Sequence, residues 1–439
     1  MTKRRKKFSS SLYYWRSRAH FYASAYLCTA GLTNLTWFPY DVYKRGRGSY
    51  LFVNAIVTGV LVVPLLHMEA ILGQFSHFGN RGVFELSPVF AGISHAMAYL
   101  GALTAATGAM SVSYAVLYLV ACAQTTAPWE TCSGYDKAAC YVSELSGPVA
   151  TLVAQQYKPR SAIQPRDVKV LKKTGKNREK NVFFSFFSKS QKWKKNLKNF
   201  QRGRSRRNRQ DTALCPVGSF YFVLVFALFF AKPTTFSVQL IYTAVLLRVF
   251  MLMTLIAKTV GQASSSDVWK ELFRFNVADV LDIQAWRTSA ARSLYAVGCS
   301  RSFVRLASWN KFHHDYRCIA PIVAWANFLT SLCSSVMVFL LLGLLQSQEK
   351  GSSLDEFFGS KDAPFQSVME ALQLLEPRRS FTALYWGMLF LMGIWDLAIL
   401  QEVVVEDLVV EFPRLRNHFA FMKLWFAILM FSCSLLLCT

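Results

Sequence analysis

The chain has 439 residues, of which 53% are hydrophobic and 15% aromatic, and its formal net charge is +24. Several apolar stretches reach the roughly 20 residues that an α-helix needs to cross the hydrocarbon layer of a membrane. Water-soluble helical proteins rarely contain so many long apolar segments with so few charges inside them. The composition therefore argues against a soluble protein and predicts an all-α polytopic membrane protein.

Residues 1–22 are predicted to form a basic cytosolic tail. The tail begins with MTKRRKK, but no short apolar core with a small-residue cleavage site follows it, so a signal peptide is not indicated. Because positively charged flanks stay on the cytosolic side of a membrane, the N-terminus is predicted to lie in the cytosol.

The apolar runs predict nine membrane helices. They lie near residues 23–43, 50–73, 89–123, 216–232, 236–259, 283–309, 319–346, 381–404 and 420–438. Transmembrane helices 1–3 thus fall within 23–123 and helices 4–9 within 215–439, with a large loop at 124–214 between them. The chain stops inside the ninth apolar run, which suggests a shortened protein.

The large loop carries most of the charge. Its segment 158–209 contains 19 Lys or Arg residues against Asp167 and Glu179. Such a segment has too few core-forming residues to fold alone, and disorder is the first interpretation. Binding to anionic lipid or to the phosphates of a nucleic acid are the functional alternatives. The aromatic run FFSFF and Trp193 suit lipid better than bases, so no nucleic-acid partner is expected.

Cys132 and Cys140 lie in the polar run PWETCSGYDKAAC of the same loop. A disulfide between them would require an oxidising compartment, so we predict that the loop is extracellular. The positive-inside rule opposes this, but it is weak for a loop of this length. No Cys or His cluster has metal-ligand spacing, and no catalytic motif is found, so neither an enzyme nor a cofactor is predicted.

The stretch AGLTNLTWFPYDVYKRGRGSYLF begins as an apolar helix and then reaches Pro39. A proline inside a membrane helix removes a backbone donor, which is costly in lipid unless another group compensates. We interpret the stretch as an unwound turn at which Gly31 permits irregular dihedrals and freed carbonyls beside Asn34 coordinate a cation. A proline kink packed against neighbouring helices is the alternative.

This stretch resembles the first-helix signature of the sodium:neurotransmitter symporters, G-L-G-N-V-W-R-F-P-Y followed by Y-K-N-G-G-G-A-F. Later segments resemble landmarks of that family in the same order, namely VVPLLHMEAILGQFS, APWETC, ASWNKFHH, NFLTSLCSSVMVFLLLG and EDLVVEFPRLR. The resemblance covers most of the chain except 158–209. It implies a divergent, C-terminally shortened member with about nine of twelve helices of an inverted-repeat fold, located in the plasma membrane.

The resemblance implies sodium-coupled symport of an amino-acid-like or neurotransmitter-like solute, with chloride as a possible further ion. Asn34 and Asn327 match two asparagines of the first sodium site, and Ser331 matches a chloride-site serine. Gly31 stands where monoamine carriers have an aspartate, which favours a solute that bears its own carboxylate. Gly108 takes the place of a third-helix tyrosine that touches the substrate.

Several positions depart from the family pattern. Trp37 replaces the outer-gate arginine, and Thr36 replaces a tryptophan. Trp395 replaces a ligand of the second sodium site, with Asp396 in the place of the neighbouring serine. An ungapped count puts Tyr295 on a hydroxyl position that ligates sodium. We therefore predict that a cation binds at the first site and that the second site is empty or altered.

The sixth predicted helix also carries Arg292, Arg301 and Arg305, and no carboxylate in the first or third helix is an obvious partner for them. These departures leave two alternatives to transport. The chain is then a non-transporting or degenerate relative of the family, or a basic protein that acts at a membrane surface or on nucleic acid through 158–209.

Overall fold

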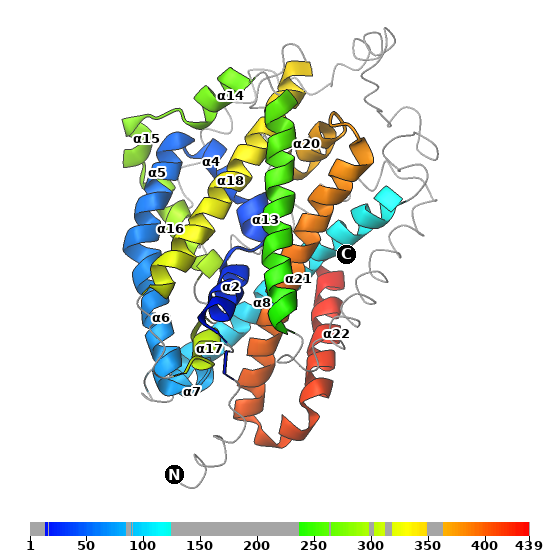
Figure 1. Cartoon of the computed structure of the whole chain (residues 1–439). Coiled ribbons are helices and arrows are strands. Elements are labelled where there is room, and N and C mark those ends of the chain that lie inside the picture. Colours follow the sequence, from blue (N-terminus) through cyan, green and yellow to red (C-terminus); the bar gives the residue numbers. More distant parts are fainter. Residues whose placement is uncertain are drawn as a thin grey trace, which may run out of the picture. The chain divides into compact units, whose positions relative to one another are not determined.

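The apolar runs of the sequence form helices in the computed structural model of the chain (Figure 1). The structure describes residues 14–15, 17–84, 89, 91–123, 237–262, 265–297, 303–311, 318–348 and 363–438. Every regular element within these ranges is a helix. The basic segment 158–209, Cys132, Cys140, Arg301 and the predicted helix at 216–232 lie outside the described residues.

The helices of the N-terminal part are α2 (Arg18–Thr29), α3 (Leu32–Thr36), α4 (Phe38–Lys44), α5 (Gly48–Val57), the π-helix η2 (Thr58–Val62), α6 (Val63–Ser76), α7 (Asn80–Phe84) and α8 (Ala91–Ala123). Those of the C-terminal part are α13 (Ser237–Gln262), α14 (Ser265–Leu272), α15 (Val277–Leu281), α16 (Ile283–Val297), α17 (Phe303–Ser308), α18 (Ile319–Gln348), α20 (Ala363–Leu372), α21 (Arg378–Glu411), the 3-10 helix η5 (Pro413–His418) and α22 (Phe419–Cys438). Apart from Ala123 at the end of α8, these elements belong to one unit of the chain, 1–122 with 215–438.

Among the described residues, four helical segments are long and apolar enough to cross a membrane. They are Gly48–Ser76, Ile241–Gly261, Ile319–Ser347 and Arg378–Val409. Each of these segments coincides with a membrane helix that the sequence predicted. The structure thus confirms the prediction of an all-α membrane protein.

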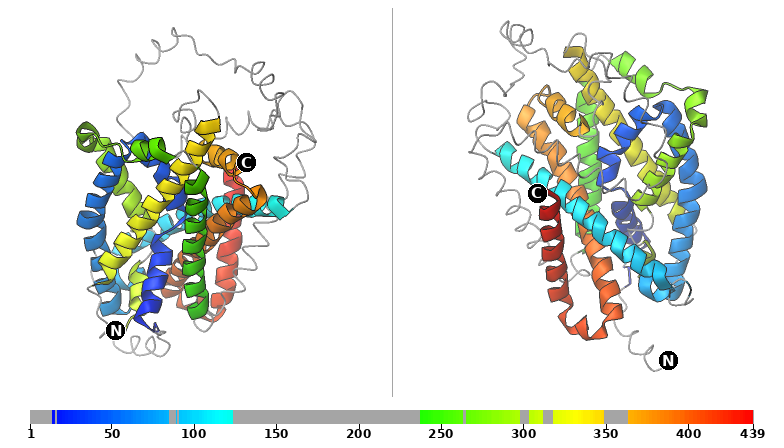
Figure 2. Two further views of the ribbon diagram at one scale, coloured as in Figure 1. Left: turned by 45° about the horizontal axis from the view of Figure 1, so that its top comes forward. Right: turned by 180° about the vertical axis from the view of Figure 1, so that it is seen from behind.

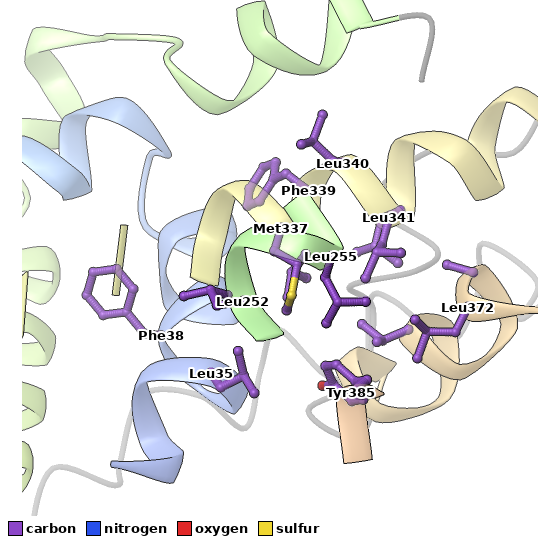
Figure 3. Packing of buried hydrophobic residues seen from close by; sticks show 14 of the residues in the cluster. Leu35, Phe38, Leu252, Leu255, Met337, Phe339, Leu340, Leu341, Leu372 and Tyr385 are labelled. Carbon is purple, nitrogen blue, oxygen red and sulfur yellow. The ribbon is translucent and has the colours of Figure 1, made fainter. Parts of the chain in front are cut away.

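The central element of the packing is α18, which contacts α2, α3, α4, α6, α13 and α20. Its sequence is apolar on nearly all sides, as expected for a helix that is surrounded by others. Figure 3 shows Phe339 and Leu341 of α18 in one buried cluster with Leu252 and Leu255 of α13 and Leu35 of α3. The part of the first helix that follows its interruption is therefore held against α18 by apolar packing.

Two glycines allow helices to approach closely. A Cβ atom at Gly73 in α6 would lie 2.1 Å from the carbonyl oxygen of Val304 in α17, so only glycine fits this contact. A Cβ at Gly393 in α21 would lie 2.2 Å from Cγ2 of Val112 in α8. Figure 2 shows the long helix α8 crossing α21. The glycines thus fix the spacing between the α6 and α17 pair and between the α8 and α21 pair.

Candidate functional site

The first predicted membrane helix is interrupted at Gly31. The helix α2 ends at Thr29, Ala30 and Gly31 are not helical, and α3 begins at Leu32. The extended backbone of Gly31 has φ −90° and ψ −169°. This interruption leaves backbone carbonyl and N–H groups without the partners that a continuous helix would give them.

Pro39 is not the cause of the interruption, contrary to the role that we assigned to it from the sequence. It lies in the first turn of α4, where its missing N–H group costs no helical hydrogen bond. Only Trp37 separates α3 from α4, and its backbone stays in the right-handed helical region. The proline therefore permits a mild irregularity at Trp37, while the unwound turn lies eight residues earlier at Gly31.

Asn34 and Asn327 meet at this interruption, although 293 residues separate them in the sequence. The Nδ2 of Asn34, in α3, donates a hydrogen bond of 2.6 Å to Oδ1 of Asn327, in α18. The Asn34 side chain is only 3% exposed. The structure thus brings together the two residues that the sequence predicted as partners in one cation site.

The orientation of the two amides determines what they can bind. In the structure one amide donates to the other, so only the oxygen of Asn327 is engaged in the contact. A cation needs both oxygens to point at the same place, because amide N–H groups cannot ligate it. A half-turn of the Asn34 amide achieves this without moving the helix backbone.

The guanidinium of Arg248, in α13, covers the last carbonyl before the interruption. Its Nη1 donates a hydrogen bond of 2.5 Å to the carbonyl oxygen of Ala30, and its Cζ lies 5.9 Å from the centroid of the Tyr26 ring. Arg248 is 1% exposed, so the charge is fully buried. Our sequence reading missed this residue, although an arginine within the apolar run AVLLRVFMLM is a signal for function.

Asp396, in α21, covers the first N–H group after the interruption. The backbone N–H of Leu32 donates a hydrogen bond of 3.2 Å to Oδ2 of Asp396, which is 8% exposed. The preceding residue, Trp395, packs in an apolar cluster with Leu27 of α2 and with Ile241 and Ala244 of α13. At the positions predicted for the altered second sodium site, the carboxylate of Asp396 thus accepts from a backbone N–H group, and the indole of Trp395 makes apolar contacts.

The expectation that Arg292 has no carboxylate partner is wrong. Its Nε donates to Oδ2 of Asp41, in α4, at 2.5 Å, and its guanidinium carbon lies 5.3 Å from the centroid of the Trp37 ring. Asp41 and Trp37 are four residues apart and share one face of the helix, so Arg292 of α16 reaches both. Asp41 lies within the first predicted helix, but the sequence does not show that this face of the helix meets α16.

Other predicted site residues have local roles in the structure. The hydroxyl of Ser331 donates to the carbonyl oxygen of Asn327 at 3.1 Å, and that of Thr36 donates to Leu32 at 3.1 Å, each within its own helix. At Gly108 a Cβ would lie 3.5 Å from Cδ2 of Leu397, so this position faces α21. Two further side chains of the sixth predicted helix, Tyr295 and Arg305, lie in α16 and α17.

Tyr295, near the end of α16, is 37% exposed. Among the described residues its hydroxyl makes no hydrogen bond, and the structure does not place it on Asn34 or Asn327. Arg305, in α17, lies 4.8 Å from the centroid of the Trp309 ring and donates a long hydrogen bond to Ser308. The ring contact of Arg305 is thus with the residue just after its own helix.

Comparison with known proteins agrees with this architecture. The model of the sodium:neurotransmitter symporter family matches residues 13–439. The chain is 23% identical over 415 residues to a sodium- and chloride-dependent betaine transporter of Caenorhabditis elegans, covering 92% of this chain and 64% of the relative. It is 24% identical over 408 residues to the sodium-dependent nutrient amino acid transporter 1 of Drosophila virilis, covering 92% and 62%.

A third relative is the sodium- and chloride-dependent neutral and basic amino acid transporter B(0+) of Mus musculus, which is 23% identical over 405 residues, covering 91% of this chain and 62% of the relative. The chain therefore spans less than two thirds of the length of these relatives. The family model describes symporters, which are transporters rather than enzymes. Together with the family landmarks in its sequence, the match over residues 13–439 shows that the chain belongs to the sodium:neurotransmitter symporter family.

Proposed function

We propose that the chain is a sodium-coupled secondary transporter of an amino-acid-like or neurotransmitter-like solute. The observation that carries this proposal is the contact between Asn34 and Asn327 at the interruption of the first helix. Relatives named for the transport of betaine, of nutrient amino acids, of neutral and basic amino acids and of glycine support the class of solute.

Sodium is a substrate of this proposed reaction, and the two amides are its proposed ligands. Amide and carbonyl oxygens can replace the hydration shell of a hard cation, as they do in ion pathways of other membrane proteins. Asn34 belongs to α3 and Asn327 to α18, so an ion held by both joins the two helices. The solute is proposed to lie at Gly31. Because α3 begins directly after this residue, binding of the ion also fixes the backbone there.

Chloride is a possible further substrate, as the names of several relatives indicate for those proteins. Ser331 is the residue of this chain that we propose to face it. Its hydroxyl donates to the backbone carbonyl of Asn327, one turn earlier in α18. A chloride ion at this place would take the same proton, so the hydroxyl must rotate away from the carbonyl when the ion binds.

The ion pair of Asp41 and Arg292 is proposed to hold the outer end of the site. It links α4 with α16, and the guanidinium also lies against Trp37, which stands where other family members have their outer-gate arginine. The positive charge is thus supplied by a different helix. Solute entry from that side would require α16 to separate from α4.

Uptake into proteoliposomes tests the transport proposal. The purified full chain is reconstituted, and uptake of radiolabelled betaine, glycine, neutral and basic amino acids and amines without a carboxylate is followed under an inward sodium gradient. We expect sodium-dependent uptake that falls by about ten-fold or more in Asn34→Ala and in Asn327→Ala, since each loses an ion ligand. The matched control is Asn54→Ala, which removes a buried amide that donates to Ser289 at 2.8 Å, between α5 and α16.

Uptake that is indifferent to sodium, or that is unchanged by both variants, would contradict the proposed site. Equal losses in Asn34→Ala and in the control Asn54→Ala would indicate a general effect on folding. Uptake of no solute at all, from vesicles in which the chain is correctly folded, would instead support a non-transporting member of the family.

We further propose that the protein lies in the plasma membrane with its N-terminus in the cytosol. With 216–232 as a span, this topology places the loop of Cys132 and Cys140 outside and Cys318, a free and exposed thiol before α18, inside. An impermeant thiol reagent should therefore label the loop cysteines on intact cells after mild reduction, and Cys318 only after permeabilisation. Labelling of Cys318 on intact cells would reverse the topology.

A further inference from the structure

Two charged side chains cover the backbone on either side of Gly31. The guanidinium of Arg248 donates to the carbonyl oxygen of Ala30 at 2.5 Å, and the carboxylate of Asp396 accepts from the N–H of Leu32 at 3.2 Å. These are the residues immediately before and after Gly31. The free backbone groups of the interruption are therefore capped by a cation and an anion that belong to the chain itself.

The position of Arg248 on α13 is specific to this site. The neighbouring side chains Leu246, Val249 and Phe250 are 70%, 44% and 64% exposed, whereas Arg248 is 1% exposed. The side of α13 that faces lipid around Arg248 is thus apolar, and the arginine itself points into the protein. Burial of a guanidinium in a membrane helix is costly, and such residues are retained where they meet a specific partner.

A carbonyl oxygen at the end of an interrupted membrane helix is a typical ligand for a mobile coupling ion. At Ala30 a guanidinium already occupies this oxygen. The side chain of Trp395 is also engaged, because it packs with Leu27 and Ile241 in an apolar cluster between α2, α13 and α21. The N–H group of an indole is a donor only and cannot ligate a metal cation.

We propose that Arg248 is a tethered cation that takes the place of a second coupling ion at the interruption of the first helix. The inference rests on the proposed function and makes it more specific. Arginine keeps its charge throughout the physiological pH range, and this one is covalently attached to α13. It stabilises the unwound backbone in every state of the protein, but it cannot be exchanged or carried across the membrane.

A difference in ion stoichiometry follows. The amides of Asn34 and Asn327 are neutral and can reorient toward a mobile ion, whereas the backbone oxygen of Ala30 already accepts from Arg248. We therefore expect a single sodium ion to bind to each chain. Asp396 balances the charge of Arg248 across Gly31, so removal of the arginine alone leaves a carboxylate and a carbonyl that together suit a cation.

The experiment is equilibrium binding of radioactive sodium to the purified full chain in detergent, with no solute present. We expect one sodium ion per chain in the wild type and its loss in Asn34→Ala. Arg248→Ala should bind an additional ion, and Arg248→Lys should not, because the ammonium keeps the tethered charge. Lys258→Ala is the matched control, since it removes a basic residue of the same helix that lies 5.6 Å from the Phe381 ring, away from Gly31.

A folded Arg248→Ala protein that binds no additional sodium would overturn the inference, as would two sodium ions bound to the wild type. If Arg248→Ala folds poorly, the folded fraction is compared after purification in sodium chloride and in choline chloride. Recovery by sodium alone supports the inference, and equal losses in both salts contradict it. A wild type that binds no sodium while Arg248→Ala binds one would contradict the proposed transport site only.

Discussion

The groups around Asn34 and those around Gly31 lie within two turns of the predicted first helix, but only those around Gly31 cap backbone groups of its interruption. At Asn34 a neutral amide from α18 completes the site through one hydrogen bond. At Gly31 a guanidinium and a carboxylate from α13 and α21 cap the adjacent backbone groups. Neutral amides can reorient at little cost, whereas buried charges that have found their partners resist any change.

This difference teaches how one fold can have different ion requirements. An interrupted membrane helix needs a positive charge near its free carbonyls, but the fold does not specify where the charge comes from. A mobile ion provides stability that depends on its concentration and on its gradient. A tethered side chain provides the same stabilisation at all times, so it adds nothing to coupling. The predictions below test whether the two regions differ in this way.

The largest expected effect is that of Arg248→Met. Methionine fills much of the same space without a charge, so the Ala30 carbonyl loses its donor and the cap before Gly31 loses its positive charge. We expect a loss of about 3 kcal/mol in the free energy of unfolding. Thermal unfolding in detergent measures it, and sodium chloride should restore part of the loss when compared with choline chloride. A loss below that of Lys258→Met, the control on the same helix, would contradict the prediction.

Asp396→Asn should have the second largest effect. The amide oxygen still accepts from the N–H of Leu32, but the charge that balances Arg248 is lost. We expect a cost of about 2 kcal/mol, because hydrogen bonds to charged groups contribute more than neutral ones. The double variant with Arg248→Met should be less destabilised than the sum of the single variants. Additive losses would show that the two charges act independently.

Asp396 also bears on the class of solute. An unwound N–H group next to Gly31 is where related transporters bind an anionic substrate group. In this chain Asp396 already accepts from that group. We therefore expect amines without a carboxylate to compete for uptake more strongly than amino acids, in contrast to the expectation from Gly31 alone. Preference of the wild type for amino acids would contradict this prediction and support the expectation from Gly31 that the solute bears its own carboxylate.

A smaller effect is expected for the amide pair. Asn34→Ala and Asn327→Ala each remove one side of a neutral hydrogen bond of 2.6 Å and leave the other amide buried. We expect each to cost about 1.5 kcal/mol in choline chloride, with a coupling energy of about 1 kcal/mol in a double-mutant cycle. In sodium chloride the coupling should increase, because the bound ion joins both oxygens. Coupling that is independent of sodium would argue against a shared ion.

The sequence predicted the helices well because long apolar runs decide where a membrane helix lies. The span expected at 319–346 is observed as α18 over Ile319–Gln348, and that at 236–259 as α13 over Ser237–Gln262. The interruption at Gly31 was also predicted, but its cause was assigned to Pro39. Proline in the first turn of a helix costs no hydrogen bond, and this position of Pro39 became clear only once the start of α4 was known.

The contacts between distant helices were harder to predict. Asn34 and Asn327 were paired through the family resemblance, not through any periodicity in this chain. The partners of Arg248 and Arg292 were missed because a sequence shows which face of a helix carries a charge, but not which neighbouring helix that face meets. Asp41 reaches Arg292 only because α4 continues past Pro39, and Ala30 reaches Arg248 only because α2 ends at Thr29.

The smallest expected effect is that of Ser331→Ala. The hydroxyl of Ser331 donates to the carbonyl of Asn327 in its own helix, and such bonds add little to a helix that is already complete, so we expect a change below about 0.5 kcal/mol in the free energy of unfolding. Ser335→Ala is a matched control, because its hydroxyl donates to Ser331 at 3.0 Å in the same way, one turn later. If Ser331 faces chloride, replacement of chloride by gluconate should lower uptake in the wild type and in Ser335→Ala but leave Ser331→Ala unchanged. The same chloride dependence in both variants would remove Ser331 from the ion site, although its backbone bond would still hold the carbonyl beside the sodium ligand Asn327.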